Sequence, residues 1–229
     1  MRTSTTATFS RTKKLTTLAC LSAISYVMWA VGRIPVLSAG PLILRYDPKD
    51  IVIAFVGFIF GPLSAFAVSV VVSFVQMITL STTGPIGFIM NVISTCTFVC
   101  TAAYIYKKKK TLKSAVVGLV FGLLLMTATM MLWNYIVTPI WMGVPRAAVV
   151  ALLLPLFLPF NLISGGLNAT LTLLLYKPLT RALRGMGVVP ERESDEPAAS
   201  KKLSLGVFLV SGLVFISLAL MVMVFQGVI

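Results

Sequence analysis

Seven apolar stretches fix the solvent in which this chain folds. Most of them reach the roughly 20 residues that an α-helix needs to cross a hydrocarbon core about 30 Å thick. Hydrophobic residues make up 58% of the chain and charged residues only 11%. The sequence therefore predicts an all-α integral membrane protein. The expected spans lie near residues 15–36, 48–60, 62–80, 85–106, 112–138, 147–178 and 203–227.

The lysine and arginine residues indicate how these spans are oriented. The net charge is +13, but the basic residues flank the apolar stretches and do not alternate with exposed aromatic residues. This is the positive-inside pattern of membrane proteins rather than a nucleic-acid surface. If the basic N-terminus is cytoplasmic and every stretch crosses, only Arg33, Arg45, Lys49 and Arg146 lie outside. The short stretch 48–60 must then cross, and the C-terminus is external.

The chain divides into four parts. Residues 1–14 form the cytoplasmic basic N-terminus, and residues 15–182 form a six-helix membrane domain. Residues 183–202 are rich in Glu, Ser, Pro and Ala, a composition that cannot bury a core, so we expect a flexible cytoplasmic linker. Residues 203–229 supply an additional transmembrane helix.

Several reagents of catalysis and ion coupling are missing from the sequence. The chain has no histidine, no phosphate-binding glycine loop and no nucleophile beside a base. No ionisable residue lies deep in a predicted span, which argues against a proton-driven pump. Cys96 and Cys100 share a helix face, but without further ligands they are better explained as packing residues than as a metal site. We therefore expect neither an enzyme nor a bound cofactor or metal.

Polar side chains inside the predicted spans suggest a binding pocket. Asn91, Asn134 and Asn161 lie in the outer half of three different spans, and Ser164, Gly165 and Asn168 continue the face of Asn161 at spacings of three, four and seven. Asparagines in membranes often join helices by hydrogen bonds, and this alternative stays open. The neighbouring aromatic residues Trp133, Tyr135 and Phe160 favour a pocket for a neutral, partly aromatic molecule with many hydroxyl groups.

Asp47-Pro48-Lys49-Asp50 stands between two apolar stretches and reads as a helix start. Asp47 is expected to cap the helix, Pro48 suits the first helical position, and Asp50 occupies the capping-box position. In a membrane protein, a charged cap at the mouth of a helix is a candidate lid or ligand contact.

An ordered set of short segments resembles the substrate-binding S components of energy-coupling factor (ECF) transporters, most closely the riboflavin type. The segments are Leu44-Arg45-Tyr46-Asp47-Pro48-Lys49-Asp50-Ile51, Phe60-Gly61-Pro62-Leu63, Thr82-Thr83-Gly84, Asn91, Tyr104-Ile105-Tyr106-Lys107-Lys108, Trp133-Asn134-Tyr135 and Leu158-Pro159-Phe160-Asn161-Leu162-Ile163. The resemblance covers roughly residues 12–182. It implies a six-helix bundle in a prokaryotic plasma membrane that captures a vitamin from outside. Its implied partners are a transmembrane coupling subunit and two ATPases, with no nucleic acid.

The polar side chains and the resemblance together give the expected binding residues. For the substrate they are Leu44, Tyr46, Asp47, Asp50, Thr83, Asn91, Asn134, Tyr135, Phe160, Asn161, Ser164 and Gly165. Ala19 and Ala23 form a small-xxx-small face in the first span. S components dock their coupling subunit through such a face, although packing inside the bundle would use the same motif.

The chain departs from the riboflavin-type pattern in its polar residues. Ser164 stands where a lysine is often found, and Ser69, Val72 and Ser73 stand where charged or amide residues are found. The resemblance therefore implies riboflavin or a related flavin, with another vitamin as the alternative. An autonomous carrier of a small neutral solute and a membrane-embedded enzyme or assembly factor are the alternatives from other classes.

Overall fold

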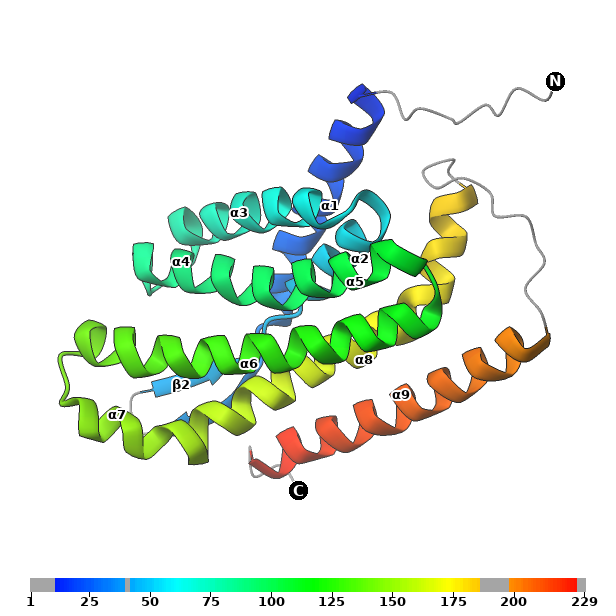
Figure 1. Cartoon of the computed structure of the whole chain (residues 1–229). Coiled ribbons are helices and arrows are strands. Elements are labelled where there is room, and N and C mark those ends of the chain that lie inside the picture. Colours follow the sequence, from blue (N-terminus) through cyan, green and yellow to red (C-terminus); the bar gives the residue numbers. More distant parts are fainter. Residues whose placement is uncertain (1–10, 40–41, 186–197, 226–229) are drawn as a thin grey trace.

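The protein is a bundle of helices that run up and down beside one another, with a short hairpin at one end (Figure 1). The computed structural model describes residues 11–39, 42–185 and 198–225. The elements are α1 Arg11–Gly32, β1 Pro35–Ala39, β2 Leu42–Arg45, α2 Lys49–Phe60, α3 Pro62–Thr79, α4 Gly84–Thr95, η1 Cys96–Cys100, α5 Thr101–Lys109, α6 Leu112–Met142, α7 Arg146–Leu152, η2 Leu153–Phe157, α8 Leu158–Gly185 and α9 Ala198–Phe225. Within these residues, 6 helical segments are long and apolar enough to cross a membrane. The expected helical membrane protein is confirmed.

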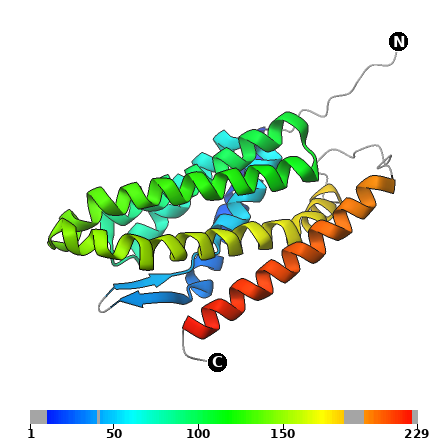
Figure 2. The same cartoon turned by 60° about the horizontal axis from the view of Figure 1, so that its bottom comes forward.

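The first helix ends earlier than predicted, because α1 stops at Gly32 instead of continuing to residue 36. Proline disfavours helical geometry in the residue before it, and Pro35 follows Ile34. The next residues form an antiparallel hairpin of β1 and β2, and the Tyr46 amide closes it by donating to the Ile34 carbonyl at 2.7 Å. Figure 2 shows this hairpin beside α8. The turn signal Gly40-Pro41 was present in the sequence.

Helix α2 is buried along almost its whole length. Every residue from Lys49 to Phe58 is buried, and its 12 residues make it too short to be counted among the spanning helices. It starts under the hairpin and ends near the start of α1, where the Lys14 ammonium lies 6.0 Å from the centre of the Phe60 ring. It therefore returns the chain through the interior of the bundle.

Helix α6 approaches η1 and α5 closely because two of its glycines face the backbone of these elements. A methyl group on Gly118 would lie 2.7 Å from the Ala102 carbonyl oxygen, and one on Gly122 would lie 2.3 Å from that of Phe98. Small residues allow such contacts in membranes, where helices associate by close packing. Gly118 and Gly122 are therefore the small-xxx-small motif that this bundle uses internally.

Two π-helical turns interrupt the long helices. One of them, η2, contains Pro155 and separates α7 from α8. The second turn, η1, contains Cys96 and Cys100. Helix α8 extends to Gly185 and α9 begins at Ala198, so both reach into the expected linker. The rest of the linker, residues 186–197, and most of the expected N-terminal segment lie outside the described residues.

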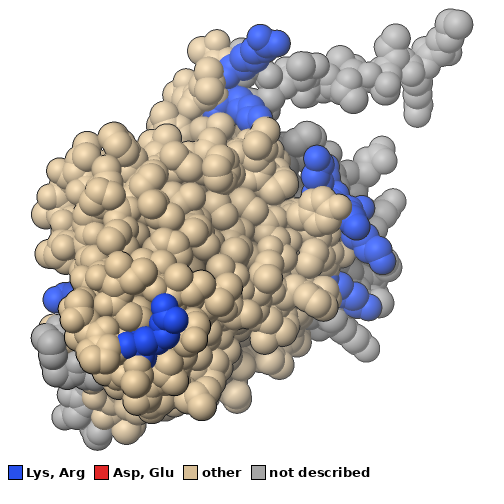
Figure 3. Space-filling model, turned by 60° about the vertical axis from the view of Figure 1, so that its left-hand side comes forward, with Lys and Arg blue, Asp and Glu red and all other residues tan. Residues whose placement is uncertain are grey.

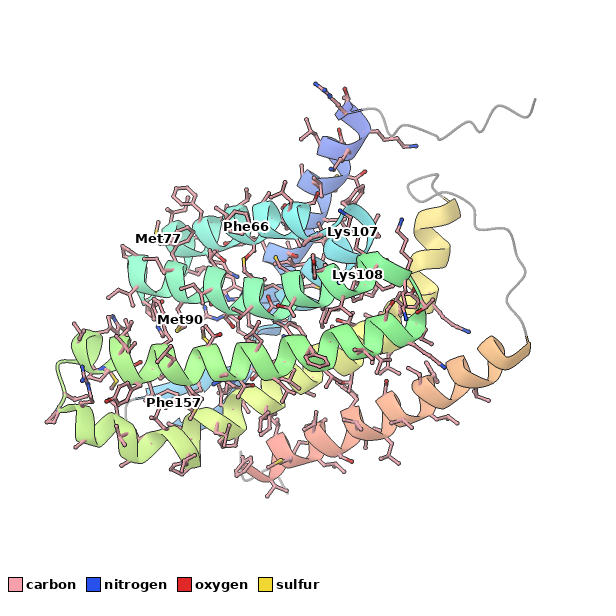
Figure 4. The ribbon with its side chains drawn as sticks, in the orientation of Figure 1. Phe66, Met77, Met90, Lys107, Lys108 and Phe157 are labelled. Carbon is pink, nitrogen blue, oxygen red and sulfur yellow. The ribbon has the colours of Figure 1, made fainter. Side chains whose placement is uncertain are left out.

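Basic residues gather at one end of the bundle. Figure 4 shows Lys107 and Lys108 there, and the Tyr106 and Tyr176 hydroxyls form a hydrogen bond of 2.7 Å nearby. Figure 3 shows a broad uncharged surface, with most of the Lys and Arg side chains at its margins. This separation agrees with the positive-inside pattern. The orientation of the two ends in the membrane stays a prediction.

We expect Gly122→Leu to destabilise the bundle, because its new side chain would overlap the backbone of Phe98. Overpacking costs about 1–3 kcal/mol or more, which corresponds to a decrease of roughly 2–12 °C in melting temperature. Thermal melting in detergent measures the change. Gly206→Leu is the matched control, since nothing lies within 4 Å of a methyl group there. Equal melting temperatures for the two variants would contradict the close packing of α6 against η1.

Candidate functional site

A cavity of about 480 Å³ opens at the end of the bundle opposite the lysines. Its walls come from the end of α1, the hairpin, the start of α2, the loop after α3, η2, and helices α4, α6 and α8. Figure 4 labels Met90 and Phe157, which lie on two of these walls. A cavity of this size is typical of sites that enclose a small organic molecule.

Nearly all of the predicted substrate-binding residues meet in this cavity. Tyr135 is the exception: its side chain is 40% exposed, and its ring centre lies 5.1 Å from the Arg146 guanidinium carbon. The other predicted residues all line the cavity: Leu44, Tyr46, Asp47, Asp50, Thr83, Asn91, Asn134, Phe160, Asn161, Ser164 and Gly165. The fold thus brings together side chains that are more than 100 positions apart in the sequence.

The three predicted asparagines differ in what they can offer a ligand. Asn134 donates to the Met130 carbonyl at 2.8 Å and accepts from Thr138 at 2.9 Å, so both ends of its amide are used within α6. Asn161 donates to the Phe157 carbonyl at 2.7 Å, and its oxygen accepts no hydrogen bond from the described residues. The side-chain oxygen of Asn91 likewise accepts no hydrogen bond from the described residues. The two free acceptors favour a binding role for Asn91 and Asn161, whereas Asn134 fits the structural alternative.

Asn91 is held from behind by a buried amide of α3. Its nitrogen donates to the Gln76 side-chain oxygen at 3.4 Å, and Gln76 is only 1% exposed. On the opposite wall, the Ser164 hydroxyl is buried without a hydrogen-bond partner among the described residues. An unpaired buried hydroxyl costs about 1–3 kcal/mol, so a polar atom of a ligand would be stabilising beside it.

Asn168 connects the hairpin loop to α8, although it was not among the predicted site residues. Its side-chain oxygen accepts from the Tyr46 hydroxyl at 2.8 Å, and its nitrogen donates to the Asp47 carbonyl at 2.9 Å. Its spacing of seven from Asn161 places both on one face of α8, and this was the available signal. Asn168 thereby fixes Tyr46 and Asp47 at the cavity wall.

Lys49 is a buried cation at the base of the hairpin. It is 2% exposed and pairs with Asp47, with Asp50 at 3.9 Å on its other side. The Thr95 hydroxyl donates to Asp50 at 2.7 Å, and Ser25 donates to the Lys49 carbonyl at 3.4 Å. A buried charge is tolerated only when it is paired and hydrogen-bonded. This cluster joins α1, α2 and α4.

The predicted capping box at Asp47 and Asp50 is wrong. Helix α2 has Pro48 at its N-cap position, and the Pro48 side chain makes no capping hydrogen bond. Asp47 instead accepts from the Lys49 amide at 3.2 Å, while Asp50 faces Thr95 and the Lys49 ammonium. The buried ammonium needs the carboxylates as counter-charges, so Asp50 does not reach back to the helix start.

Aromatic and sulfur-containing side chains complete the walls, and most were not predicted. They include Trp29, Met90, Met126, Met130, Trp133, Trp141 and Phe157. Arg33 covers the outer face of Trp29, with its guanidinium carbon 4.6 Å from the ring centre. Hydroxyl groups of Ser81, Thr82 and Ser94 lie among the lining residues. The cavity thus combines flat apolar surfaces with scattered polar groups. No group of His, Cys, Asp or Glu in the described part of the chain could hold a metal ion.

Ala19 and Ala23 lie on an exposed face of α1. Val27 and Val31 continue the same side of α1 and are 56% and 83% exposed. Packing within the described bundle therefore does not use this pair of alanines. Docking to another membrane protein through this face remains a prediction.

Fold and cavity together define a membrane-embedded binding protein for a small solute. The profile of the family described as "ECF transporter, substrate-specific component" matches residues 13–176, and the chain belongs to this family. Its members serve transport and are not enzymes.

Named relatives of this chain are riboflavin transporters. It is 30% identical to the riboflavin transporter RibU of Staphylococcus aureus over 75% of this chain and 93% of the relative. It is 31% identical to RibU of Streptococcus thermophilus, over 76% and 86%. It is 28% identical to the riboflavin transporter FmnP of Bacillus subtilis, over 68% and 85%. A solved structure titled as the S component of a bacterial ECF transporter matches with a TM-score of 0.64 at 29% identity, over 76% of this chain and 99% of that one.

We expect Lys49→Met to destabilise the protein strongly, because it leaves the Asp47 and Asp50 carboxylates without their buried counter-charge. Breaking a buried ion pair costs about 3–5 kcal/mol, or on the order of 6–20 °C in melting temperature. The double variant Lys49→Met/Asp50→Asn should recover part of this loss. Lys107→Met, at the exposed basic end, is the control. An unchanged melting temperature for Lys49→Met would show that the cluster is not a structural support.

Proposed function

We propose that this chain is the riboflavin-capturing subunit of an ATP-driven vitamin importer in a prokaryotic plasma membrane. The observation that carries the proposal is the cavity itself, which combines aromatic walls with two amide acceptors and one hydroxyl that have no hydrogen-bond partner among the described residues. The relatives named as riboflavin transporters point to the same ligand.

The chemistry of riboflavin matches the cavity in three respects. Its flat ring system can stack on aromatic side chains such as Trp133 and Phe160. The single ring N–H needs an acceptor, which the Asn91 or Asn161 oxygen can provide, and the ring carbonyls need donors such as Ser164. The ribityl hydroxyls can use the polar loop that contains Ser81 and Thr83. Neutral hydrogen-bonding groups of this kind suit an uncharged vitamin.

Transport by this chain requires a partner that supplies energy. The sequence has no nucleotide-binding motif and no ionisable residue deep in a spanning helix, apart from the Lys49 cluster beside the cavity. We infer that an ECF module supplies this energy through a transmembrane coupling subunit and two ATPases. In this arrangement the cavity faces outward, the N-terminus is cytoplasmic and the C-terminus is external. The exposed Ala19 and Ala23 face then contacts the coupling subunit.

Isothermal titration with riboflavin should show binding by the purified protein and weaker binding by Asn161→Ala. Removing the amide leaves a desolvated ligand group unpaired, which costs about 1–3 kcal/mol, or roughly 5- to 150-fold in affinity. Thr129→Ala on the exposed side of α6 is the control, and it should bind like the unmodified protein.

A melting curve separates binding from folding in this experiment. If Asn161→Ala melts earlier but binds riboflavin with unchanged affinity, Asn161 is a structural residue and leaves the site. If the unmodified protein binds another vitamin and no flavin, the riboflavin assignment fails. Ser164, which stands in place of a lysine, is then the first position to examine.

Uptake into vesicles should require both the ECF module and ATP. Replacing Ala19 or Ala23 by Trp should leave riboflavin binding intact and lower uptake at least tenfold, because a bulky side chain prevents close helix contact. Ala151→Trp, at an exposed alanine of α7, is the matched control. Concentrative uptake by the chain alone would refute the need for a module.

A further inference from the structure

Helix α9 is an addition to the part of the chain that the family shares. The family profile ends at residue 176, and α9 begins at Ala198. The solved S component is matched over 99% of its length while covering 76% of this chain. The matched core therefore leaves α9 without an assigned role.

Helix α9 packs along α8 and reaches the hairpin with its C-terminal end (Figure 2). Val222 is buried there in a small apolar cluster with Val36, Tyr46, Ile163 and Leu167. One turn earlier, Leu218 fills the space over Gly166 of α8, where an added methyl group would lie 2.9 Å from it. The opposite side of α9 is exposed: Val224, for example, is 59% exposed. The contact is thus confined to one face of α9.

This cluster lies directly behind the wall of the cavity. Tyr46 lines the cavity and belongs to the cluster, and Phe160 lines the cavity and packs against the cluster. The Tyr46 hydroxyl is fixed by Asn168, and Tyr46 shares its apolar cluster with Val222 of α9. Val36 belongs to β1, so the same cluster also supports the hairpin. Neither Val36 nor Val222 touches the cavity itself.

We propose that α9 braces the hairpin and Tyr46 against the cavity, with Val222 as the positioning residue, and thereby slows release of the bound molecule. A ligand enclosed under the hairpin leaves only when this wall moves. In a membrane, helices hold one another by close packing, so loss of the methyl groups of Val222 loosens the wall without changing any group that touches the ligand. The effect falls on dissociation, the step in which variants of one site usually differ.

The kinetic test rests on the proposed binding of riboflavin. Stopped-flow quenching of riboflavin fluorescence in detergent gives the association and dissociation rates. Val222→Ala should raise the dissociation rate about 3- to 10-fold and leave the association rate within about twofold, since affinity changes appear mainly in dissociation. Val222→Ile should retain slow release. Val224→Ala makes the same change on the exposed face and is the matched control.

A double-mutant cycle tests whether α9 acts through the hairpin. Val36→Ala removes the contact from the β1 side and should raise the dissociation rate similarly. The double variant Val36→Ala/Val222→Ala should be no faster than the faster single variant, because the effects of residues packed in one cluster are not additive. Additive effects, or a Val222→Ala protein that releases riboflavin at the unmodified rate, would overturn the brace. If Val222→Ala does not fold, Val36→Ala alone must accelerate release.

A measurement without ligand separates the brace from the riboflavin assignment. Hydrogen–deuterium exchange in the amides of β1 and β2 should be faster in Val222→Ala than in Val224→Ala, because opening of the hairpin exposes its backbone hydrogen bonds. If the unmodified protein binds no riboflavin, the proposed function fails, and this exchange still decides on the brace. Equal exchange in the two variants would overturn it.

Discussion

The ion cluster around Lys49 is the interaction on which the rest of the structure depends. An ammonium group cannot remain unpaired inside a membrane bundle, and here Asp47 and Asp50 flank it. Asp50 is held in turn by Thr95 of α4, and Ser25 of α1 binds the Lys49 carbonyl. The point where the hairpin meets α2 is therefore fixed from several helices. Each residue of the following helix, and each wall of the cavity, is positioned relative to this point.

The two ends of the bundle differ in packing because they differ in residue size. Towards the basic end, Gly57, Gly118 and Gly122 bring helix backbones together until no space remains. At the other end, large side chains such as Trp133 and Phe160 line an open space. Close packing resists deformation, so the first region can act as a rigid support for the second. Polar groups in the open region are then free to serve a ligand.

The helices could be predicted from the sequence because long apolar stretches leave few alternatives in a membrane. Asn91 and Asn161 could be predicted as cavity residues because polar residues are conspicuous in apolar stretches. The hairpin was missed, since strands of 5 and 4 residues carry almost no periodic signal. Tyr135 was misplaced for a geometric reason: neighbouring residues on a helix point about 100° apart, so Asn134 can face the cavity while Tyr135 faces outward.

The burial of Lys49 could not be predicted because it is a property of the tertiary fold. The sequence groups Lys49 with the outer basic residues, and an acidic neighbour on each side does not by itself indicate burial. Its counter-charges are neighbours in sequence, but Thr95 and Ser25 come from other helices. The capping prediction failed for the same reason, since it weighed only contacts near the helix start.

The shortness of α2 explains where the room for a ligand comes from. Twelve residues of helix measure about 18 Å, whereas the hydrocarbon core measures about 30 Å. The helix is thus about 12 Å shorter than the core, and its start at Lys49 and Asp50 lines the cavity. Phe157 of η2 lines the cavity as well, so the interruption between α7 and α8 also contributes to its shape. The chain between Gly32 and Lys49 forms the hairpin and sets where α2 starts. Moving that start by one turn would therefore change the volume of the cavity while the surrounding helices kept their contacts.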